Sequence, residues 1–340
     1  AVAGVVDSGW LTMGEKTTQF EVEFEHFLSN DVKCVAVSNG TAALHMALLA
    51  VGVEAGDEVI IPALTFVADI NVVQIVGAKP RLADSTSLED WNVSVESIKK
   101  QITPRTKAVI IVHYAGYPCK DIKEISELCK LRGISLIEDV AHAPGASIDG
   151  QMCGTFGDIG CFSFFSNKNL SVGEGGMASS SNTELVEKLK LIRSHGMTSL
   201  TLDRHKGRSI SYDVACTGLN YRMDEMRSAI GLVQLKKLPA GNAKRKELTE
   251  RYRSNLADSL IAIPFSLLGN NVNSVYHILP VLLPESIDRI AIIQHLKSQR
   301  IQSSIHYPPF WNFTAYKDYF SPSDAPVTAK ICNHQLTLPL

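Results

Sequence analysis

The chain has 340 residues, of which 45% are hydrophobic and 20% charged, and its 33 Lys and Arg residues nearly balance its 35 Asp and Glu residues. This composition is typical of a soluble globular protein of about two domains, and the net charge of −2 argues against a nucleic-acid partner. Seven cysteines without a C-x-x-C pair argue against a disulfide framework or a cysteine zinc site and favour a cytoplasmic protein. The sequence offers no convincing membrane span or signal peptide.

Short apolar runs alternate with helical patterns over the first 140 residues. The runs expected to form strands are 34–37, 58–61, 80–83, 108–113 and 134–137. The helical patterns between them are 42–51, 67–76, 95–101 and 122–132, the third of which begins after a capping Ser94. Because strands that alternate with helices are typical of βαβ units, we predict an α/β fold with a mostly parallel central sheet and helices on both faces.

The pattern changes after about residue 160. The apolar runs 161–165 and 177–178 flank a glycine-rich segment, and helices are expected at 184–192 and 223–238, the second continuing past Pro239 to about residue 256. A strand at 275–283, a helix at 287–299 and a strand at 301–305 indicate a small α+β unit. We therefore predict a large domain over residues 1–240 and a small C-terminal domain over 241–340.

Polar residues follow several of the predicted strands, where ligands of open α/β sheets bind. Ser38, Asn39, Gly40 and Thr41 lie between a strand and a helix, so they form either a phosphate site at the helix N-terminus or a simple capping turn. The chain has no G-x-G-x-x-G and no P-loop motif. A dinucleotide-binding fold is therefore not supported.

An acid and a lysine stand at the ends of two later runs. Asp139 follows the run 134–137 and could hold a cationic ring nitrogen, or it could be a helix cap or surface acid. His142 could line the same site or be structural. Lys168 follows an apolar strand and precedes a glycine-rich turn, so it is either a partly buried amine suited to a Schiff base or a surface lysine.

Phe66 is a further candidate for the site, and the histidines are candidates for metal ligands. Phe66 comes just after a strand and could stack on a flat ring or make a core contact. The ten histidines form neither H-x-x-x-H nor H-E-x-x-H, and the chain contains no G-x-S-x-G elbow. We therefore expect no metal site and no serine hydrolase.

Taken together, these segments resemble the DegT/DnrJ/EryC1/StrS family of aminotransferases, which use pyridoxal 5'-phosphate (PLP). Each motif is weak alone, but their order over nearly the whole chain is specific. The further matching motifs are Gly9–Gly14, Gly173–Gly176, His195–Met197, Gly218–Met223 and Ile305–Pro308. The resemblance implies the type I PLP-dependent aminotransferase fold and a homodimer with two shared active sites.

The resemblance also assigns roles at the matching positions. It makes Lys168 the residue that forms the Schiff base and moves the proton, Asp139 the partner of the pyridine nitrogen, and Phe66 the side chain stacked on the ring. His142 takes the place of a His or Gln beside the cofactor and is a catalytic candidate together with Lys168 and Asp139. The phosphate-binding positions are Gly40, Thr41, Ser163 and, from the partner subunit, Asn220. The candidate substrate-binding positions are Arg222, His306 and Tyr307, of which Arg222 either binds substrate or holds the loop of its motif.

The implied activity is transfer of an amino group from an amino acid, expected to be L-glutamate, to a keto sugar. We expect this sugar to be nucleotide-linked, in amino-sugar, polysaccharide or antibiotic biosynthesis. An aminocyclitol acceptor, a PLP-binding sensor without turnover and a PLP-dependent dehydration are the alternatives. Lys168 argues against the branch of the family that has histidine there and dehydrates sugars. Family members usually extend further at both ends, so we expect the chain to lack a stretch at each end.

Overall fold

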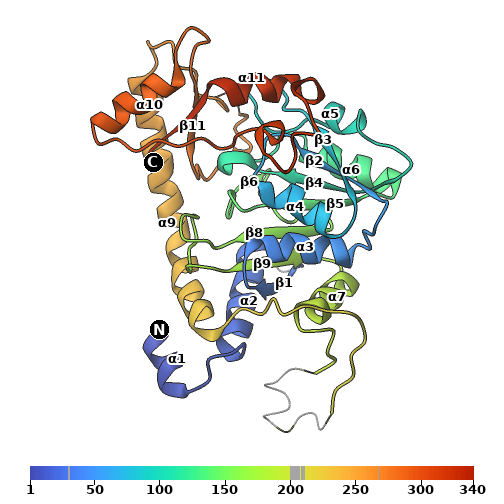
Figure 1. Cartoon of the computed structure of the whole chain (residues 1–340). Coiled ribbons are helices and arrows are strands. Elements are labelled where there is room, and N and C mark those ends of the chain that lie inside the picture. Colours follow the sequence, from blue (N-terminus) through green and yellow to red (C-terminus); the bar gives the residue numbers. More distant parts are fainter. Residues whose placement is uncertain (30, 200–206, 208–210, 267) are drawn as a thin grey trace.

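A central sheet of seven strands organises the computed structural model of the chain, which describes residues 1–29, 31–199, 207, 211–266 and 268–340 (Figure 1). The order is β1-β9-β8-β5-β4-β2-β3. The strands are β1 (Lys33–Val37), β2 (Glu58–Pro62), β3 (Lys79–Ala83), β4 (Thr106–Val112), β5 (Ser135–Asp139), β8 (Ile159–Ser163) and β9 (Gly176–Ser180). Only β9 runs against its neighbours, so the prediction of a mostly parallel sheet is confirmed.

Both faces of this sheet are covered because apolar residues alternate between its two sides along each strand. In β2, Val59 and Ile61 pack on one face and Ile60 on the other. The helices on the first face are α3 (Gly40–Ala50), α4 (Val67–Ile75) and α7 (Thr183–Arg193). The helices on the second face are α2 (Glu15–Leu28), α5 (Val95–Lys99) and α6 (Ile122–Arg132). The predicted cap of α5 is present, since the Ser94 side chain accepts a hydrogen bond from the Ser97 amide.

Two N-terminal helices, α1 (Val2–Ser8) and α2, were not among the predicted elements. The buried residues Phe20, Phe24 and Leu28 recur every four residues along α2 and bury one face of that helix. The Glu225 carboxylate binds the start of α2, because it accepts hydrogen bonds from the backbone amides of Gly14, Lys16 and Thr17. This contact over more than 200 residues cannot be read from a local pattern.

One long helix, α9 (Glu225–Asn255), joins the two predicted helices across Pro239 and leads to the C-terminal region (Figure 1). The Asp224 side chain caps it by accepting a hydrogen bond from the Arg227 amide. The predicted domain boundary at residue 240 falls inside this helix. The division into residues 1–240 and 241–340 stays a prediction.

The C-terminal region contains β11 (Leu279–Leu282), α10 (Arg289–Ser298), α11 (Pro326–His334) and β12 (Gln335–Leu338). The strand predicted at 301–305 is wrong, because only Ser304 forms a bridge, to Thr337, while β12 pairs with β11. The strand predicted from residue 275 begins at 279, since Val275 donates instead to the Gly116 carbonyl. The remaining short elements are β6 (Ser147–Ile148), β7 (Gln151–Met152), β10 (Val272–Asn273), and 3-10 turns at Tyr114–Gly116, Phe310–Asn312 and Pro322–Asp324.

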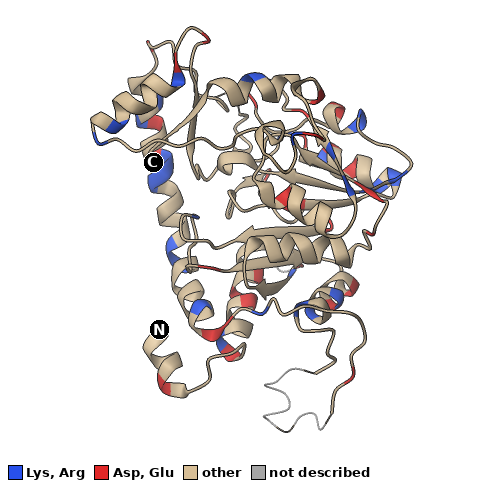
Figure 2. Ribbon diagram, viewed as in Figure 1, with Lys and Arg blue, Asp and Glu red and all other residues tan. Residues whose placement is uncertain are grey.

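The surface carries charges of both signs. Figure 2 shows acidic and basic residues interspersed over the outer helices. Within the described part of the chain, no helix combines the length and the apolar character that crossing a membrane requires. All seven cysteines are free thiols.

Candidate active site

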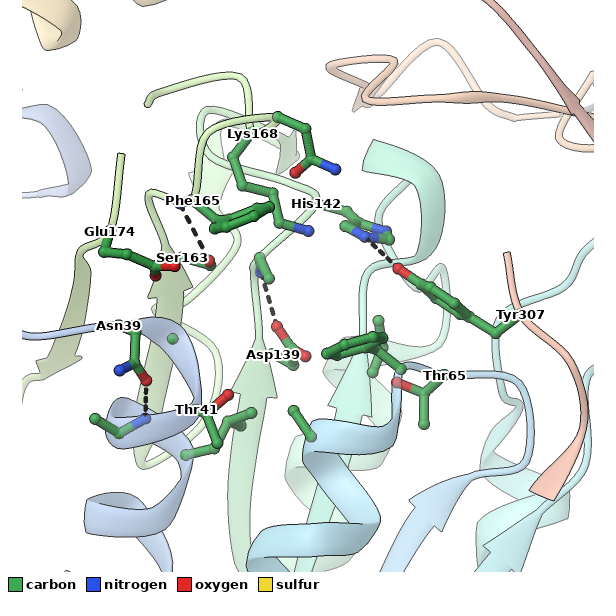
Figure 3. Close-up of a pocket in the computed structure, with 18 of the residues that line it drawn as sticks. Asn39, Thr41, Thr65, Asp139, His142, Ser163, Phe165, Lys168, Glu174 and Tyr307 are labelled. Atoms are coloured by element: carbon green, nitrogen blue, oxygen red, sulfur yellow. Dashed lines mark hydrogen bonds between the residues drawn. The ribbon is translucent and has the colours of Figure 1, made fainter. Parts of the chain in front are cut away.

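The ends of β1, β5 and β8 border a cavity of about 660 Å³ (Figure 3). Ligands of open α/β sheets bind at this place, beyond the carboxyl ends of parallel strands, and the volume is that of a small-molecule site. The structure brings together nine of the eleven residues that the sequence singled out. They are Gly40, Thr41, Phe66, Asp139, His142, Ser163, Lys168, His306 and Tyr307.

The other two predicted residues, Asn220 and Arg222, do not line this cavity. Asn220 is exposed and forms a backbone bridge with Ser194, and Arg222 is partly buried and forms one with Val37. The predicted reach of Asn220 into a partner subunit's site therefore stays a prediction, as does a substrate contact of Arg222.

Asp139 is the last residue of β5 and places its carboxylate at the floor of the cavity, where it is only 6% exposed. Burial raises its pKa, while the Ala141 amide, which donates to Oδ1 at 2.8 Å, and the nearby Lys168 act in the opposite direction. A carboxylate in this place is suited to holding a positive charge. The alternative of a surface acid is therefore ruled out by its burial.

The neighbouring Glu138 has a structural role. Because side chains alternate along a strand, it points to the other face of the sheet from Asp139. Its oxygens accept hydrogen bonds from the amides of Gly154, Phe156 and Gly157 and contact His113 Nε2 at 2.9 Å. These bonds hold the loop before β8 against β5.

Lys168 lies in the loop between β8 and β9, which folds back on itself. The Phe164 amide donates to the Gly175 carbonyl at 2.8 Å, and the Val172 amide donates to the Phe164 carbonyl at 2.9 Å. The Lys168 amino group and the Asp139 carboxylate point toward the same space (Figure 3). Burial lowers the pKa of Lys168 to about 8, against the opposing effect of Asp139. The amine is therefore neutral in about one molecule in ten at pH 7, compared with about one in 3,000 for an ordinary lysine.

The N-terminus of α3 forms an anion site on the opposite wall. Asn39 caps the helix, since its side chain accepts a hydrogen bond from the Ala42 amide at 2.8 Å. The amides of Gly40 and Thr41 precede the first intrahelical bonds, so they could bind an anion at the positive end of the helix dipole. A Cβ at Gly40 would lie 2.7 Å from Ser163 Cβ, so only glycine allows β8 to approach this closely. The Thr41 hydroxyl points into the cavity (Figure 3).

Aromatic and histidine side chains form the remaining wall. Phe66 is 52% exposed, and the centroid of its ring lies 5.5 Å from that of the Tyr307 ring. His142 is buried, with Nε2 3.0 Å from the Tyr307 hydroxyl. Burial lowers the pKa of His142 well below its ordinary value, and Lys168 adds to this effect. Burial and Lys168 likewise lower the pKa of His306 to about 4, and its Nδ1 lies 2.9 Å from Thr337 Oγ1.

Sequence reasoning missed several polar residues near the cavity. Asp69, in the first turn of α4, is fully buried and accepts a hydrogen bond from Thr65 Oγ1 at 2.5 Å. Burial and the neighbouring Asp139 raise the pKa of Asp69 well above its ordinary value. The signal was an acid inside an apolar helical stretch, four residues after a threonine. Glu174 also lines the cavity, within the glycine-rich motif Gly173–Gly176, for which no site residue was predicted.

The donor set of the cavity fits PLP. The N-terminus of α3 would bind the phosphate, Asp139 would face the pyridine nitrogen, and the neutral fraction of Lys168 would react with the aldehyde. Phe66 offers an aromatic surface to the flat ring. The phosphate, the ring nitrogen, the aldehyde and the flat ring of the cofactor would thus each have a matching residue.

Comparisons with known proteins agree with this chemistry. The model of the DegT/DnrJ/EryC1/StrS aminotransferase family matches residues 1–340. The crystal structure of the aminotransferase TlmJ from Streptoalloteichus hindustanus is 33% identical, with a TM-score of 0.91 over 100% of this chain and 89% of that one. Spr1654 from Streptococcus pneumoniae, solved in PLP and PMP forms, is 30% identical, and its PMP form has a TM-score of 0.91 over 100% and 90% of the two chains.

A third similar structure is that of a biosynthetic aminotransferase. Helicobacter pylori PseC, an aminotransferase involved in the biosynthesis of pseudoaminic acid, is 28% identical, with a TM-score of 0.91 over 99% of this chain and 89% of that one. These likenesses confirm the predicted type I fold and cofactor. The chain belongs to the DegT/DnrJ/EryC1/StrS aminotransferase family and is a PLP-dependent sugar aminotransferase.

Proposed function

We propose that the enzyme moves an amino group from an amino acid, L-glutamate in our prediction, to a nucleotide-linked keto sugar. The observation that carries this proposal is the arrangement of Lys168 and Asp139, which face one space beside an anion-binding helix terminus. This arrangement suits amino transfer because it supplies an amine, an acid and a phosphate site together. A sugar role is supported by PseC, which acts in the biosynthesis of pseudoaminic acid.

The residues around the cavity would divide the work of binding. Gly40, Thr41 and Ser163 would hold the cofactor's phosphate, and Phe66 would stack on its ring. His142 would stand beside the cofactor. Arg222, His306 and Tyr307 would contact the substrates. When bound, PLP supplies the electron sink that lets the substrate lose the proton on its amine-bearing carbon.

Lys168 and Asp139 would carry the proton transfer. The Lys168 amine would take the proton at Nζ from the substrate carbon and return it one step later, which needs a pKa near the working pH. Its pKa of about 8 meets that need. Asp139 would keep a proton on the facing ring nitrogen, and that positive charge would in turn favour the ionised carboxylate. Burial of the Asp139 carboxylate would strengthen this interaction by excluding water.

We also propose a cytoplasmic homodimer. The exposed Asn220 would reach the cofactor's phosphate in the partner subunit, so each site would need both chains. Free thiols at all seven cysteines support a reducing compartment. The division into a large domain, 1–240, and a small domain, 241–340, would place the shared sites on the large domains, with the small domain contributing His306 and Tyr307.

The test is an absorption spectrum of the purified enzyme with PLP, before and after addition of L-glutamate. We expect the band of the lysine-bound cofactor to give way to that of the amine form. A Lys168→Ala variant is the control and should bind the cofactor without the lysine-bound band. A panel of nucleotide-linked keto sugars should then restore the first band.

Other outcomes of this experiment would indicate a different function. If keto-cyclitols alone restored the lysine-bound band, the protein would be an aminocyclitol aminotransferase, which would contradict the nucleotide-sugar proposal. A lysine-bound band that ignores every amino donor would indicate a sensor, and a deaminated or dehydrated sugar product would indicate a dehydratase. Absence of any band with added PLP would contradict the proposal as a whole.

A further inference from the structure

A chain of hydrogen bonds connects the backbone to the cavity through His142 and Tyr307. The Ala115 amide donates to His142 Nδ1 at 3.2 Å. The other ring nitrogen, Nε2, lies 3.0 Å from the Tyr307 hydroxyl. Ala115 has a left-handed backbone, with φ of 57°, which non-glycine residues adopt rarely. Such conformations persist where the surrounding structure enforces them, often at functional sites.

The bond from Ala115 determines which nitrogen of His142 carries the proton. A nitrogen that accepts a hydrogen bond must present its lone pair, so Nδ1 is unprotonated. The ring is neutral, because it is buried and lies near Lys168, His277 and His306. The single ring proton is therefore on Nε2. It follows that His142 is the donor, and the Tyr307 oxygen the acceptor, in their shared bond.

The Tyr307 hydroxyl proton is therefore not used in the bond to His142. Burial keeps this hydroxyl protonated, since it raises the pKa of Tyr307. Among the described residues, the hydroxyl has no hydrogen-bond partner other than His142, and Tyr307 lines the cavity beside Phe66. Figure 3 shows its ring reaching from the cavity wall to His142. The phenol thus offers one O–H donor to a bound molecule.

The main chain holds Tyr307 firmly in place. The Gln335 side chain, at the start of β12, donates to the Tyr307 carbonyl at 2.8 Å. Gln335 is fully buried. The donor is therefore fixed at both ends, by β12 at its backbone and by His142 at its hydroxyl.

We infer that Tyr307 donates a hydrogen bond to an oxygen of the substrate, and that His142 is the positioning residue that aims this donor by giving its own Nε2 proton. This inference rests on the proposed function, because it requires a substrate in this cavity. The oxygen belongs either to the carboxylate of the amino donor or to a hydroxyl or carbonyl of the sugar. Both sources share the same chemistry, that of a hydrogen-bond acceptor.

The main test is a Tyr307→Phe variant of the PLP-loaded enzyme, which removes the donor and keeps the ring. Half-saturation is measured separately for L-glutamate and for the keto sugar found in the panel above, from the cofactor's absorption change. If Tyr307 binds a neutral oxygen, we expect the half-saturation concentration to rise about tenfold. If it binds a carboxylate, we expect a rise of up to about 100-fold. Weaker binding of glutamate alone identifies the carboxylate as the acceptor, and weaker binding of the sugar identifies a sugar oxygen. Unchanged half-saturation for both overturns the inference.

Substitutions at His142 test the positioning role. Glutamine can accept from Ala115 and donate to Tyr307, whereas alanine can do neither. His142→Ala should weaken binding of the same substrate as Tyr307→Phe, and His142→Gln should restore most of the loss. In Tyr307→Phe, adding His142→Ala should cause no further loss for that substrate. Independent, additive losses would show that His142 does not act through Tyr307.

Two controls separate this inference from folding and from the proposed function. Tyr117→Phe removes another buried hydroxyl, outside the cavity, and should leave both half-saturation values unchanged. Tyr307→Phe should retain the lysine-bound band and the thermal unfolding temperature. Long-range ¹H–¹⁵N spectra of histidine-labelled enzyme should show His142 protonated at Nε2 only. Protonation at Nδ1 would refute the argument even if the enzyme transaminates, whereas failure of wild-type turnover would refute the proposed function.

Discussion

Lys168 should react with an aldehyde at neutral pH far faster than an exposed lysine does. Only the neutral amine attacks a carbonyl, and burial lowers the pKa of Lys168 to about 8. Compared with a lysine whose pKa is 10.5, the neutral fraction of Lys168 at pH 7 is about 300-fold larger. The rate of covalent capture of PLP by the cofactor-free enzyme should therefore rise about tenfold from pH 6 to 7 and level off above about pH 8.

The assay mixes cofactor-free enzyme with PLP at each pH, reduces the product with borohydride and locates the modified lysine by mass spectrometry. Lys168→Ala is the control and should show no capture at this site. In Asp139→Asn the profile should level off below pH 8, because the Asp139 carboxylate raises the pKa of Lys168. A wild-type rate that still rises steadily to pH 10 would refute the argument from burial. A shift of the Asp139→Asn profile to higher pH would refute the assigned direction of the Asp139 effect.

Three further predictions concern the cofactor site. Asp139→Asn should lower the transamination rate at least about 100-fold with little change in the urea midpoint of unfolding, since it removes a preorganised charge; a folding defect alone would indicate a structural role. Gly40→Ala should weaken PLP binding about tenfold in an equilibrium titration, because its Cβ would lie 2.7 Å from Ser163 Cβ and displace the anion site; unchanged affinity would exclude that site. Asn220→Ala should impair PLP binding only in the partner's site, measured in mixed dimers with Lys168→Ala; impairment within its own subunit would contradict shared sites.

The sequence alone was sufficient for most elements whose signals are local, although it missed α2, in which the buried residues recur every four residues. Buried strands produce continuous apolar runs, and helices between them produce caps and amphipathic spacing, so the parallel part of the sheet was predicted closely. Asp139 and Ser163 end two such strands, β5 and β8, and Lys168 soon follows β8. Because parallel strands end at one edge, Asp139 and Lys168 could meet there, and both line the cavity together with Ser163.

The strand predicted at 301–305 shows where local patterns fail. Its apolar and polar residues fit a strand, but the available edge of β12 pairs with it only at Ser304. The partner that it needed, β12, comes more than thirty residues later. Strand formation depends on such non-local hydrogen bonds, whereas a helix satisfies its own.

Only the tertiary structure decided how the last wall of the cavity is built. Tyr307 reaches His142 across 165 residues of sequence, and Ala115, whose amide orients His142, belongs to neither motif. Asp69 likewise lies in an apolar helix, yet it is placed beside Asp139. The residue types that carry the chemistry are visible in the sequence because they follow strand ends. Their protonation and hydrogen-bond directions are not, because burial and long-range contacts determine them and both arise only when the chain packs.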